Sequence, residues 1–209
     1  MQTPRRREAA SEVDFSDDLN WYAILEGADP YYKTLELIYA YIPVPAWLSI
    51  YQLGPYTALA EVGPVLLTLD QPGNWISHWR DSFPGLAGSL IGSRQELSGV
   101  ASHLRTLISV RVQGGGEAFF RFYDSWIMSA MYDTLEDAER AMIHGPIERW
   151  LWLTGNEIKV GKRPGDYSPD CQPPEDGWLT LDSTKQGAIQ KGLAAKRTWK
   201  ETHGRCSMH

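Results

Sequence analysis

The stretch F-F-R-F-Y-D-S-W, residues 119–126, decides the fold expected for this chain. Side chains alternate between the two faces of a strand, so Phe120 and Phe122 would lie on one face and other aromatic residues on the opposite face. A strand that is apolar on both faces is normally interior. Asp124 stands where a helix N-cap is needed, because its carboxylate can accept the free N–H groups of a first turn. The stretch predicts a central strand that leads into a capped helix.

The residues before this stretch predict a hairpin. Residues 109–112 and 118–123 are strand-like, and the glycines at 114–116 between them supply the positive φ angles that a tight turn requires. Further apolar runs predict strands at 21–25, 65–69 and 87–91. The segment 147–160 reads as a strand, a tight turn and a second strand.

Helical spacing and capping residues mark the helices. Asp29 and Pro30 read as the N-cap and first position of a helix that Pro43 ends, and Asn74 as the cap of a helix that carries Trp75 and Trp79. Two further helices follow predicted capping boxes, one formed by Ser93 and Glu96 and one by Thr134 and Asp137. Gly145 closes the second of these, a helix near 127–131 precedes it, and residues 43–56 are predicted to be irregular.

Strands that alternate with helices predict an α/β fold, and the glycine hairpin makes its sheet mixed rather than purely parallel, with helices on its flanks. Composition divides the chain into four parts. These are a disordered N-terminal extension at 1–18, an α/β core at 19–161, a linker or long loop at 162–177 and a C-terminal helical appendage at 178–203.

Composition narrows the classes of partner. The net charge is -6, which offers no basic field for a phosphate backbone, so nucleic acid is not an expected partner. No apolar stretch approaches the roughly 20 residues of a membrane span, and the basic run at 5–7 is not followed by the apolar segment of a secretory signal. We therefore expect a soluble, cytoplasmic protein with no membrane contact.

The common catalytic and cofactor motifs are missing from the sequence, which has no P-loop, G-x-G-x-x-G, H-E-x-x-H or G-x-S-x-G. Ser89 lacks the spacing of a nucleophile elbow. The general-base candidates His78, His103 and His144 have no partner at triad or ligand spacing, so ordinary packing is the expectation. His203, Cys206 and His209 are residue types that can bind metal ions, but such residues more often simply belong to a polar C-terminal segment. No catalytic residue, metal, cofactor or small-molecule substrate is predicted.

Four residues are candidates for partner binding: Trp47, Arg121, Trp178 and Trp199. Arg121 lies between phenylalanines, where a cation either satisfies an interior carboxylate or anchors a partner. The three tryptophans lie in irregular or appended segments and carry the large contact area that interfaces favour. Glu26, Asp29, Asp70 and Asp124 are the carboxylates that could share a site, although each reads locally as a turn or cap residue.

Four blocks of sequence occur in an order that resembles a known family. They are W-Y-A-I-L-E-G-A-D at 21–29, L-I-S-V-R-V at 107–112, F-F-R-F-Y-D at 119–124 and G-P-I-E-R-W at 145–150. The chain resembles the bacterial type VI secretion effector chaperones, also called Tap or Tec adaptor proteins, over about residues 20–160. Glu26 stands where the family pattern usually has Asp.

The resemblance implies a cytoplasmic protein without enzymatic activity. Such a protein binds one cognate toxic effector and loads it onto a spike protein of the VgrG type for delivery. The resemblance carries over no catalytic residue and no partner contact. Two alternatives stay open: an immunity protein that neutralises a neighbouring toxin, and a small α/β enzyme that uses Asp124 or a histidine.

Overall fold

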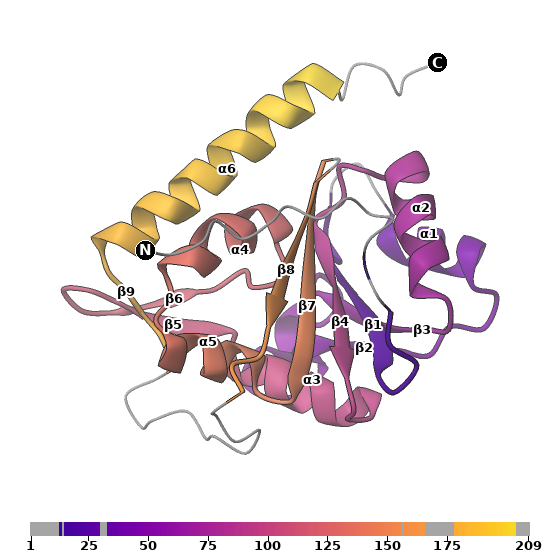
Figure 1. Ribbon diagram of the computed structural model, residues 1–209, viewed down its shortest axis with the longest axis horizontal. Helices are drawn as coiled ribbons and strands as arrows, with labels where there is room; N and C mark the ends of the chain where they lie inside the picture. The colour runs from indigo at the N-terminus through magenta and orange to yellow at the C-terminus, as the bar shows by residue number, and fades with distance from the viewer. Residues whose placement is uncertain (1–12, 14, 30–32, 156, 166–177, 204–209) are drawn as a thin grey trace.

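The computed structural model describes residues 13, 15–29, 33–155, 157–165 and 178–203. A six-stranded sheet forms its centre (Figure 1), with each strand antiparallel to its neighbours. Along the sheet the strands are β2 (Trp47–Ser49), β3 (Val65–Leu69), β1 (Asn20–Leu25), β4 (Gly88–Ser93), β7 (Ile147–Thr154) and β8 (Glu157–Lys162).

The central sheet is buried on both faces, because both sets of alternating side chains are apolar. In β1, Trp21, Ala23 and Leu25 pack in one core cluster, whereas Tyr22 and Ile24 pack in the other. The first cluster includes residues of α1 (Thr34–Tyr41) and α2 (Pro72–Ser82). The second is covered by α3 (Leu97–Thr106), α4 (Ser125–Met131) and α5 (Asp137–His144), so helices cover both faces of the sheet (Figure 1). Short 3-10 turns are η2 (Ile50–Gln52), η3 (Thr57–Leu59) and η4 (Tyr132–Thr134).

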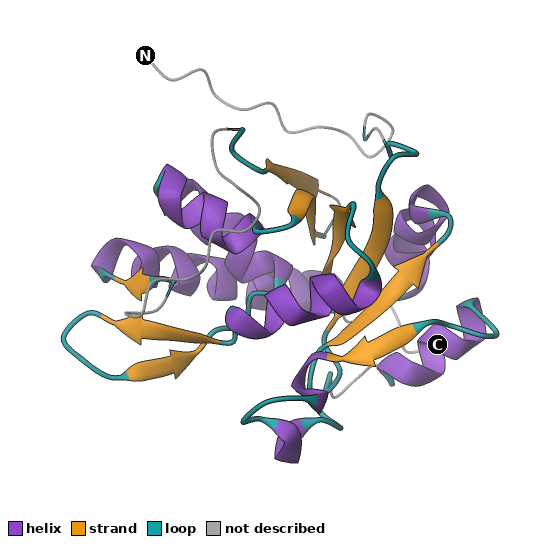
Figure 2. Ribbon diagram, turned by 90° about the horizontal axis from the view of Figure 1, so that it is seen from below, coloured by secondary structure: helices purple, strands orange, loops and turns teal. Residues whose placement is uncertain are grey.

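A smaller sheet contains the glycine hairpin (Figure 2). Its central strand β5 (Ser109–Val112) pairs antiparallel with β6 (Glu117–Phe119) and parallel with β9 (Thr180–Leu181). All three turn glycines, 114–116, have positive φ values of 91 to 110°. Because β9 comes from the C-terminal part of the chain, this sheet ties that part to the hairpin.

The last helix, α6 (Ser183–His203), runs along the outside of α4 (Figure 1). Gly192 allows the close approach, since a Cβ atom added there would lie 2.3 Å from the carbonyl oxygen of Trp126. A glycine inside a helix costs about 1 kcal/mol relative to alanine. At Gly192, the backbone of α6 itself therefore forms the contact with α4.

The structure confirms the α/β class with flanking helices and a C-terminal helix, and it corrects the arrangement of strands. The large sheet is antiparallel, and the glycine hairpin belongs to the separate small sheet that holds the parallel pair. The segment 43–56, expected to be irregular, contains the edge strand β2. The division into four parts stays a prediction, because residues 1–12 and 166–177 lie outside the described residues.

The predicted strand through Tyr123 is wrong. Strand β6 ends at Phe119, whose side chain is 59% exposed, and the Asp124 N–H donates to the carbonyl of Arg121 in a turn. Phe120 and Phe122 are buried, but Phe120 directly follows β6 and Phe122 lies in the turn, so the two do not share one face of a strand. Core packing produces the same apolar pattern without a continuous strand. The N-cap prediction is confirmed, because Asp124 accepts the Trp126 N–H at 3.1 Å.

The other predicted N-caps are wrong, although the helices they introduced are present. The helix predicted from Pro30 is described from Thr34, and α2 begins at Pro72, before Asn74. The Ser93 hydroxyl donates to the Pro146 carbonyl at 2.7 Å, and Thr134 to the carbonyl of Met131. The capping box of α5 is formed instead by Glu136 and Glu139. Capping residues have several possible partners, and tertiary contacts decide between them.

Gly145 does close α5, with a φ of 48°, and β7, the turn at Gly155 and β8 confirm the predicted strand, turn and strand. Across the described part of the chain, every helix is too short or too polar to cross a membrane.

Candidate functional site

Four charged side chains from three distant parts of the chain meet beside α4: Glu26, Arg121, Asp124 and Lys196. We call them the charge cluster. Glu26 directly follows β1, Arg121 and Asp124 lie in the turn between β6 and α4, and Lys196 lies on α6. Three of the four belong to the sequence blocks 21–29 and 119–124, so these blocks meet in space although about ninety residues separate them.

Each carboxylate of the charge cluster contacts both cations. The Lys196 ammonium lies 2.6 Å from Asp124 Oδ2 and 4.0 Å from Glu26 Oε2. The Arg121 guanidinium donates to Glu26 Oε1 and lies 3.8 Å from Asp124 Oδ2. Two negative and two positive charges balance, which is the arrangement that makes partly buried charges tolerable.

Burial and charge act in opposite directions on Arg121. Partial burial lowers the pKa of the Arg121 guanidinium, but the charge of Glu26, with smaller contributions from Tyr123 and Asp124, outweighs it and raises the pKa. The guanidinium also lies over the Tyr123 ring, 5.5 Å from its centroid. The cation is thus held on several sides by groups of the chain itself.

The charge cluster has a structural role that its geometry explains. Asp124 is fully buried, caps α4 through one oxygen and binds Lys196 through the other. It therefore joins the start of α4 to α6, while Arg121 joins the same turn to the end of β1. Every charge of the cluster has a counter-charge, so the arrangement holds elements together.

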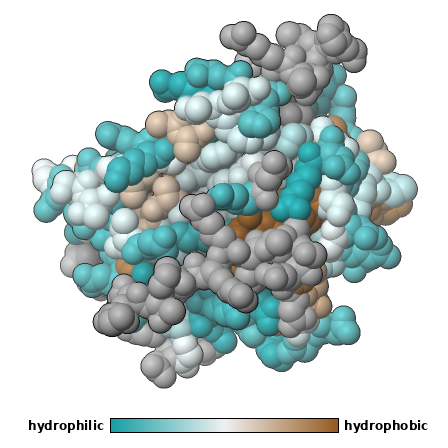
Figure 3. Space-filling view, turned by 45° about the horizontal axis from the view of Figure 1, so that its top comes forward, coloured by the Kyte–Doolittle hydropathy of each residue, from teal (hydrophilic) through white to brown (hydrophobic). Residues whose placement is uncertain are grey.

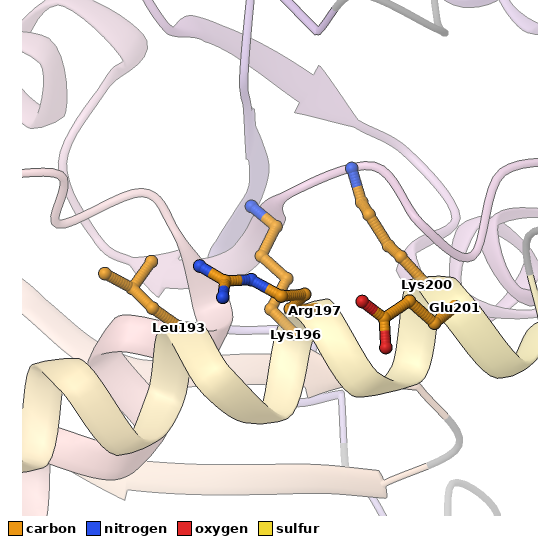
Figure 4. Close-up of a pocket in the computed structure, with 5 residues that line it drawn as sticks. All are labelled: Leu193, Lys196, Arg197, Lys200 and Glu201. Carbon is orange, nitrogen blue, oxygen red and sulfur yellow. The ribbon is translucent and has the colours of Figure 1, made fainter.

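A second ion pair continues this contact along α6. Lys200, one turn after Lys196, lies 3.5 Å from the buried Asp29. Figure 4 shows Lys196 and Lys200 reaching from the same side of α6 toward the core. They line a shallow depression of about 400 Å³ together with Leu193, Arg197 and Glu201. Because all five lining residues belong to α6, this depression is one side of a helix rather than an enclosed site.

Lys196 and Lys200 were not among the residues predicted from the sequence to have a role. Their spacing of four residues, which places two cations on one side of a helix, is the signal that points to them. Of the four carboxylates considered, the structure brings together Glu26 and Asp124, places Asp29 against Lys200 and leaves Asp70 exposed at the end of β3.

The three tryptophans predicted to bind a partner occupy different environments. Trp47 is half-buried on the edge strand β2, where its Nε1 donates to the Tyr39 hydroxyl at 3.3 Å. Trp199 is half-buried on α6 and contacts the Trp126 ring, with 6.1 Å between centroids. Trp178 is 3% exposed and packs against Phe120. Partner binding stays a prediction for all of them, and the core burial of Trp178 leaves little of its surface for a partner.

The histidines and Ser89 are each used in packing. His78 stacks on Tyr41, with 4.2 Å between centroids, and His103 Nε2 lies 2.9 Å from the Ile143 carbonyl oxygen. His144 is buried between the Ile147 carbonyl and the Tyr132 hydroxyl, each 2.9 Å away. Burial lowers the pKa of His144 to about 4. The Ser89 hydroxyl accepts the Trp150 Nε1–H at 2.7 Å.

No group of three or more potential metal ligands occurs within the described ranges. Cys206 and His209 of the predicted tail cluster lie outside those ranges. On the face drawn in Figure 3, the described surface is mostly hydrophilic, with apolar side chains exposed in small patches. Its large exposed apolar residues are Leu35, Tyr39, Val44, Leu53, Leu59, Val62, Phe119 and Leu193.

The fold defines the chain as a mixed α/β domain. The charged residues of the charge cluster form ion pairs that hold elements of this domain together. The family model described as "Domain of unknown function (DUF4123)" matches residues 21–142, more than half of the chain. The chain therefore belongs to the DUF4123 family. The match includes Glu26, Arg121 and Asp124, and α6 lies beyond it. Neither the curated proteins nor the solved structures include a match to this chain.

Proposed function

We propose that this chain is a type VI secretion effector adaptor. It binds a cognate effector in the cytoplasm, loads it onto the secretion spike and catalyses no reaction. The observation that carries the proposal is the ordered set of sequence blocks that resembles the adaptor family. Three of these blocks lie inside the DUF4123 match, which spans residues 21–142.

The use of the polar residues supports a binding role. Glu26, Arg121 and Asp124 balance one another's charge, and His144 and Ser89 are buried in hydrogen bonds of the core. In contrast, Leu53 and Phe119 are 61% and 59% exposed. Leu53 lines a groove together with Tyr56, whose ring packs against Phe119, and contiguous exposed apolar surface is typical of protein interaction sites.

Co-expression tests the proposal. The tagged chain is produced with each protein encoded by an adjacent reading frame and purified by affinity, followed by size-exclusion chromatography. We expect a stable complex with the effector, and a ternary complex when the spike protein is present. Failure of the chain to bind either protein would sink the proposal.

The same cells distinguish an adaptor from an immunity protein. An adaptor is required for delivery of the effector to neighbouring cells, whereas an immunity protein protects the cell in which the toxin is produced. Protection from intracellular toxin without any effect on delivery would favour the immunity role. Toxin delivery that is lost on deletion of the adaptor gene and restored by the wild-type gene supports the proposal.

A further inference from the structure

A groove of about 440 Å³ shares no lining residue with the charge cluster and lies between the turn that follows η2 and the C-terminal end of α3. One wall is formed by residues 53–56. The other is formed by Ser102, Arg105 and Thr106 of α3, with Ile108 and Ser109 at the start of β5. Unlike the depression on α6, this groove is bounded by several elements of the fold.

The apolar part of the groove is open to solvent. Leu53 is 61% exposed, although it lines the groove together with Pro55 and Tyr56. The Tyr56 ring packs against Phe119, with 4.9 Å between centroids, and Phe119 is 59% exposed. The apolar surface therefore continues from the groove to the edge strand β6.

Arg105 supplies the charge of the groove. Its Nε–H donates to the Ile50 carbonyl at 2.9 Å, which fixes the side chain against the groove wall. Partial burial lowers the pKa of Arg105. No carboxylate among the described residues lies within ion-pair distance of this guanidinium, in contrast to Arg121 or Arg94.

Three hydroxyl groups of the groove, those of Ser102, Thr106 and Ser109, already make hydrogen bonds within the chain. The hydroxyls of Ser102 and Thr106 donate to carbonyl oxygens of α3, at 2.9 and 2.8 Å. The Ser109 hydroxyl donates to the Glu117 carboxylate at 3.1 Å. A partly desolvated arginine beside apolar surface favours a carboxylate, because a charge-assisted hydrogen bond then replaces lost hydration.

We propose that this groove binds a segment of the protein partner in which an Asp or Glu stands beside an apolar side chain. The carboxylate pairs with Arg105, and the apolar side chain packs on Leu53 and Tyr56. This inference rests on the proposed function, since the partner is the cognate effector. Groove variants that weaken binding of the spike protein alone would contradict it. The net charge of -6 disfavours a nucleic-acid phosphate as the anion.

Binding of the purified effector and spike protein to matched variants tests the groove. Arg105→Glu and Leu53→Asp change its charge and its apolar wall, and Thr106→Trp fills it without removing the bond between Arg105 and Ile50. Arg197→Glu and Leu193→Asp make the same two chemical changes on the exposed side of α6. We expect the groove variants to weaken binding at least tenfold and the α6 variants to change it less than twofold.

Thermal melting accompanies each binding measurement. If Arg105→Glu fails to fold, Thr106→Trp decides the question, because Thr106 is exposed. A wild-type chain that binds neither protein overturns the proposed function and this inference together. Wild-type binding that all folded groove variants retain overturns the inference alone and leaves the adaptor role standing.

A photo-crosslinking side chain at position Ser102 tests the chemistry of the bound segment. The crosslinked peptide of the partner is expected to contain Asp or Glu within a few residues of an apolar residue. A crosslinked peptide without an acidic residue contradicts the proposed recognition by Arg105.

Discussion

Arg121 illustrates how a residue that looks functional in the sequence serves the fold. It lies in a turn, bonds Glu26, lies near Asp124 and contacts the Tyr123 ring. Of these partners, Asp124 is fully buried and the Glu26 side chain is only 14% exposed. The cation is needed because these carboxylates are poorly hydrated.

We expect Arg121→Ala to lower the free energy of unfolding by about 2 kcal/mol, because Lys196 alone would face two poorly hydrated carboxylates. The side chain of Arg121 is 42% exposed, so the loss should fall below that of a fully buried pair. Urea unfolding measures the change.

Arg94 is the matched control for Arg121. It also pairs with two carboxylates, Asp18 and Glu148, but its side chain is 62% exposed. Arg94→Ala should cost less than about 1 kcal/mol, because exposed ion pairs contribute little. Unchanged melting of the Arg121 variant with loss of partner binding would show that Arg121 is a contact residue instead.

His144 makes stability depend on pH. Burial lowers its pKa from 6.5 to about 4 in the folded state, so below pH 6.5 the unfolded chain binds a proton that the folded protein resists. The stability that this pKa difference contributes is fully present above pH 6.5. It is lost as the pH falls toward 4, and the loss in the free energy of unfolding reaches about 3 kcal/mol. Burial lowers the pKa of His103 too, which adds to the same trend.

Urea unfolding between pH 7 and pH 4 checks this prediction for the wild type and for His144→Gln. The variant should show a shallower decrease in the free energy of unfolding over this range, even if it is less stable at pH 7. Parallel curves for the two proteins would mean that His144 titrates normally in the folded state.

At the scale of elements, α6 shows how one helix is fixed by two different kinds of contact. Lys196 and Lys200 hold it through Asp124 and Asp29, whereas Gly192 lets its backbone approach α4. Lys200 is 32% exposed, so its ion pair should contribute modestly, whereas close packing depends on shape. We therefore expect the position of α6 to be more sensitive to Gly192 than to Lys200.

The substitution Gly192→Ala tests the close approach of α6 and α4. The added methyl group would meet the Trp126 carbonyl, so α6 must move and the free energy of unfolding should fall by about 1–3 kcal/mol. Gly187→Ala is the control in the same helix, where an added Cβ meets nothing within 4 Å. It should raise stability by up to about 1 kcal/mol. Equal effects of the two substitutions would disprove a tight contact at Gly192.

At the scale of the whole molecule, the C-terminal part of the chain takes part in the core. Trp178, Leu179 and Leu181 are buried with residues of α3 and α4, and β9 pairs with β5. The last helix then covers α4 (Figure 1). This arrangement makes the stability of the family-matched region depend on residues beyond it.

Two truncations test this dependence. A chain that ends at residue 177 loses β9 and the buried Trp178, so we expect no cooperative thermal unfolding and exposed apolar surface that binds a hydrophobic dye. A chain that ends after Asp182 keeps both and should unfold cooperatively at a lower temperature. Wild-type melting of the shorter chain would identify residues 178–203 as an independent appendage.

Much of the fold could be predicted because local sequence patterns determine many of its strands and turns. The apolar runs of β1, β3 and β4, the glycine turn of the hairpin and the strand pair at β7 and β8 are short-range features. The caps at Asn74, Ser93 and Thr134 failed because a short polar side chain can bond to other partners: Asn74 donates to the Gln71 side chain, and Ser93 and Thr134 donate to backbone carbonyls. The strand predicted through Tyr123 failed because buried turns and buried strands share one apolar pattern.

By itself the sequence determined the α/β class, the main strands and helices, the cap at Asp124 and the blocks that point to an adaptor family. Only the tertiary structure decided that Glu26, Arg121, Asp124 and Lys196 form one balanced charge cluster, and that Arg105 has no described carboxylate partner beside an apolar groove. The physical reason is the distance along the sequence over which each kind of interaction acts. Hydrophobic periodicity and turn chemistry act over a few residues, whereas charge balance and burial depend on groups that only folding brings together.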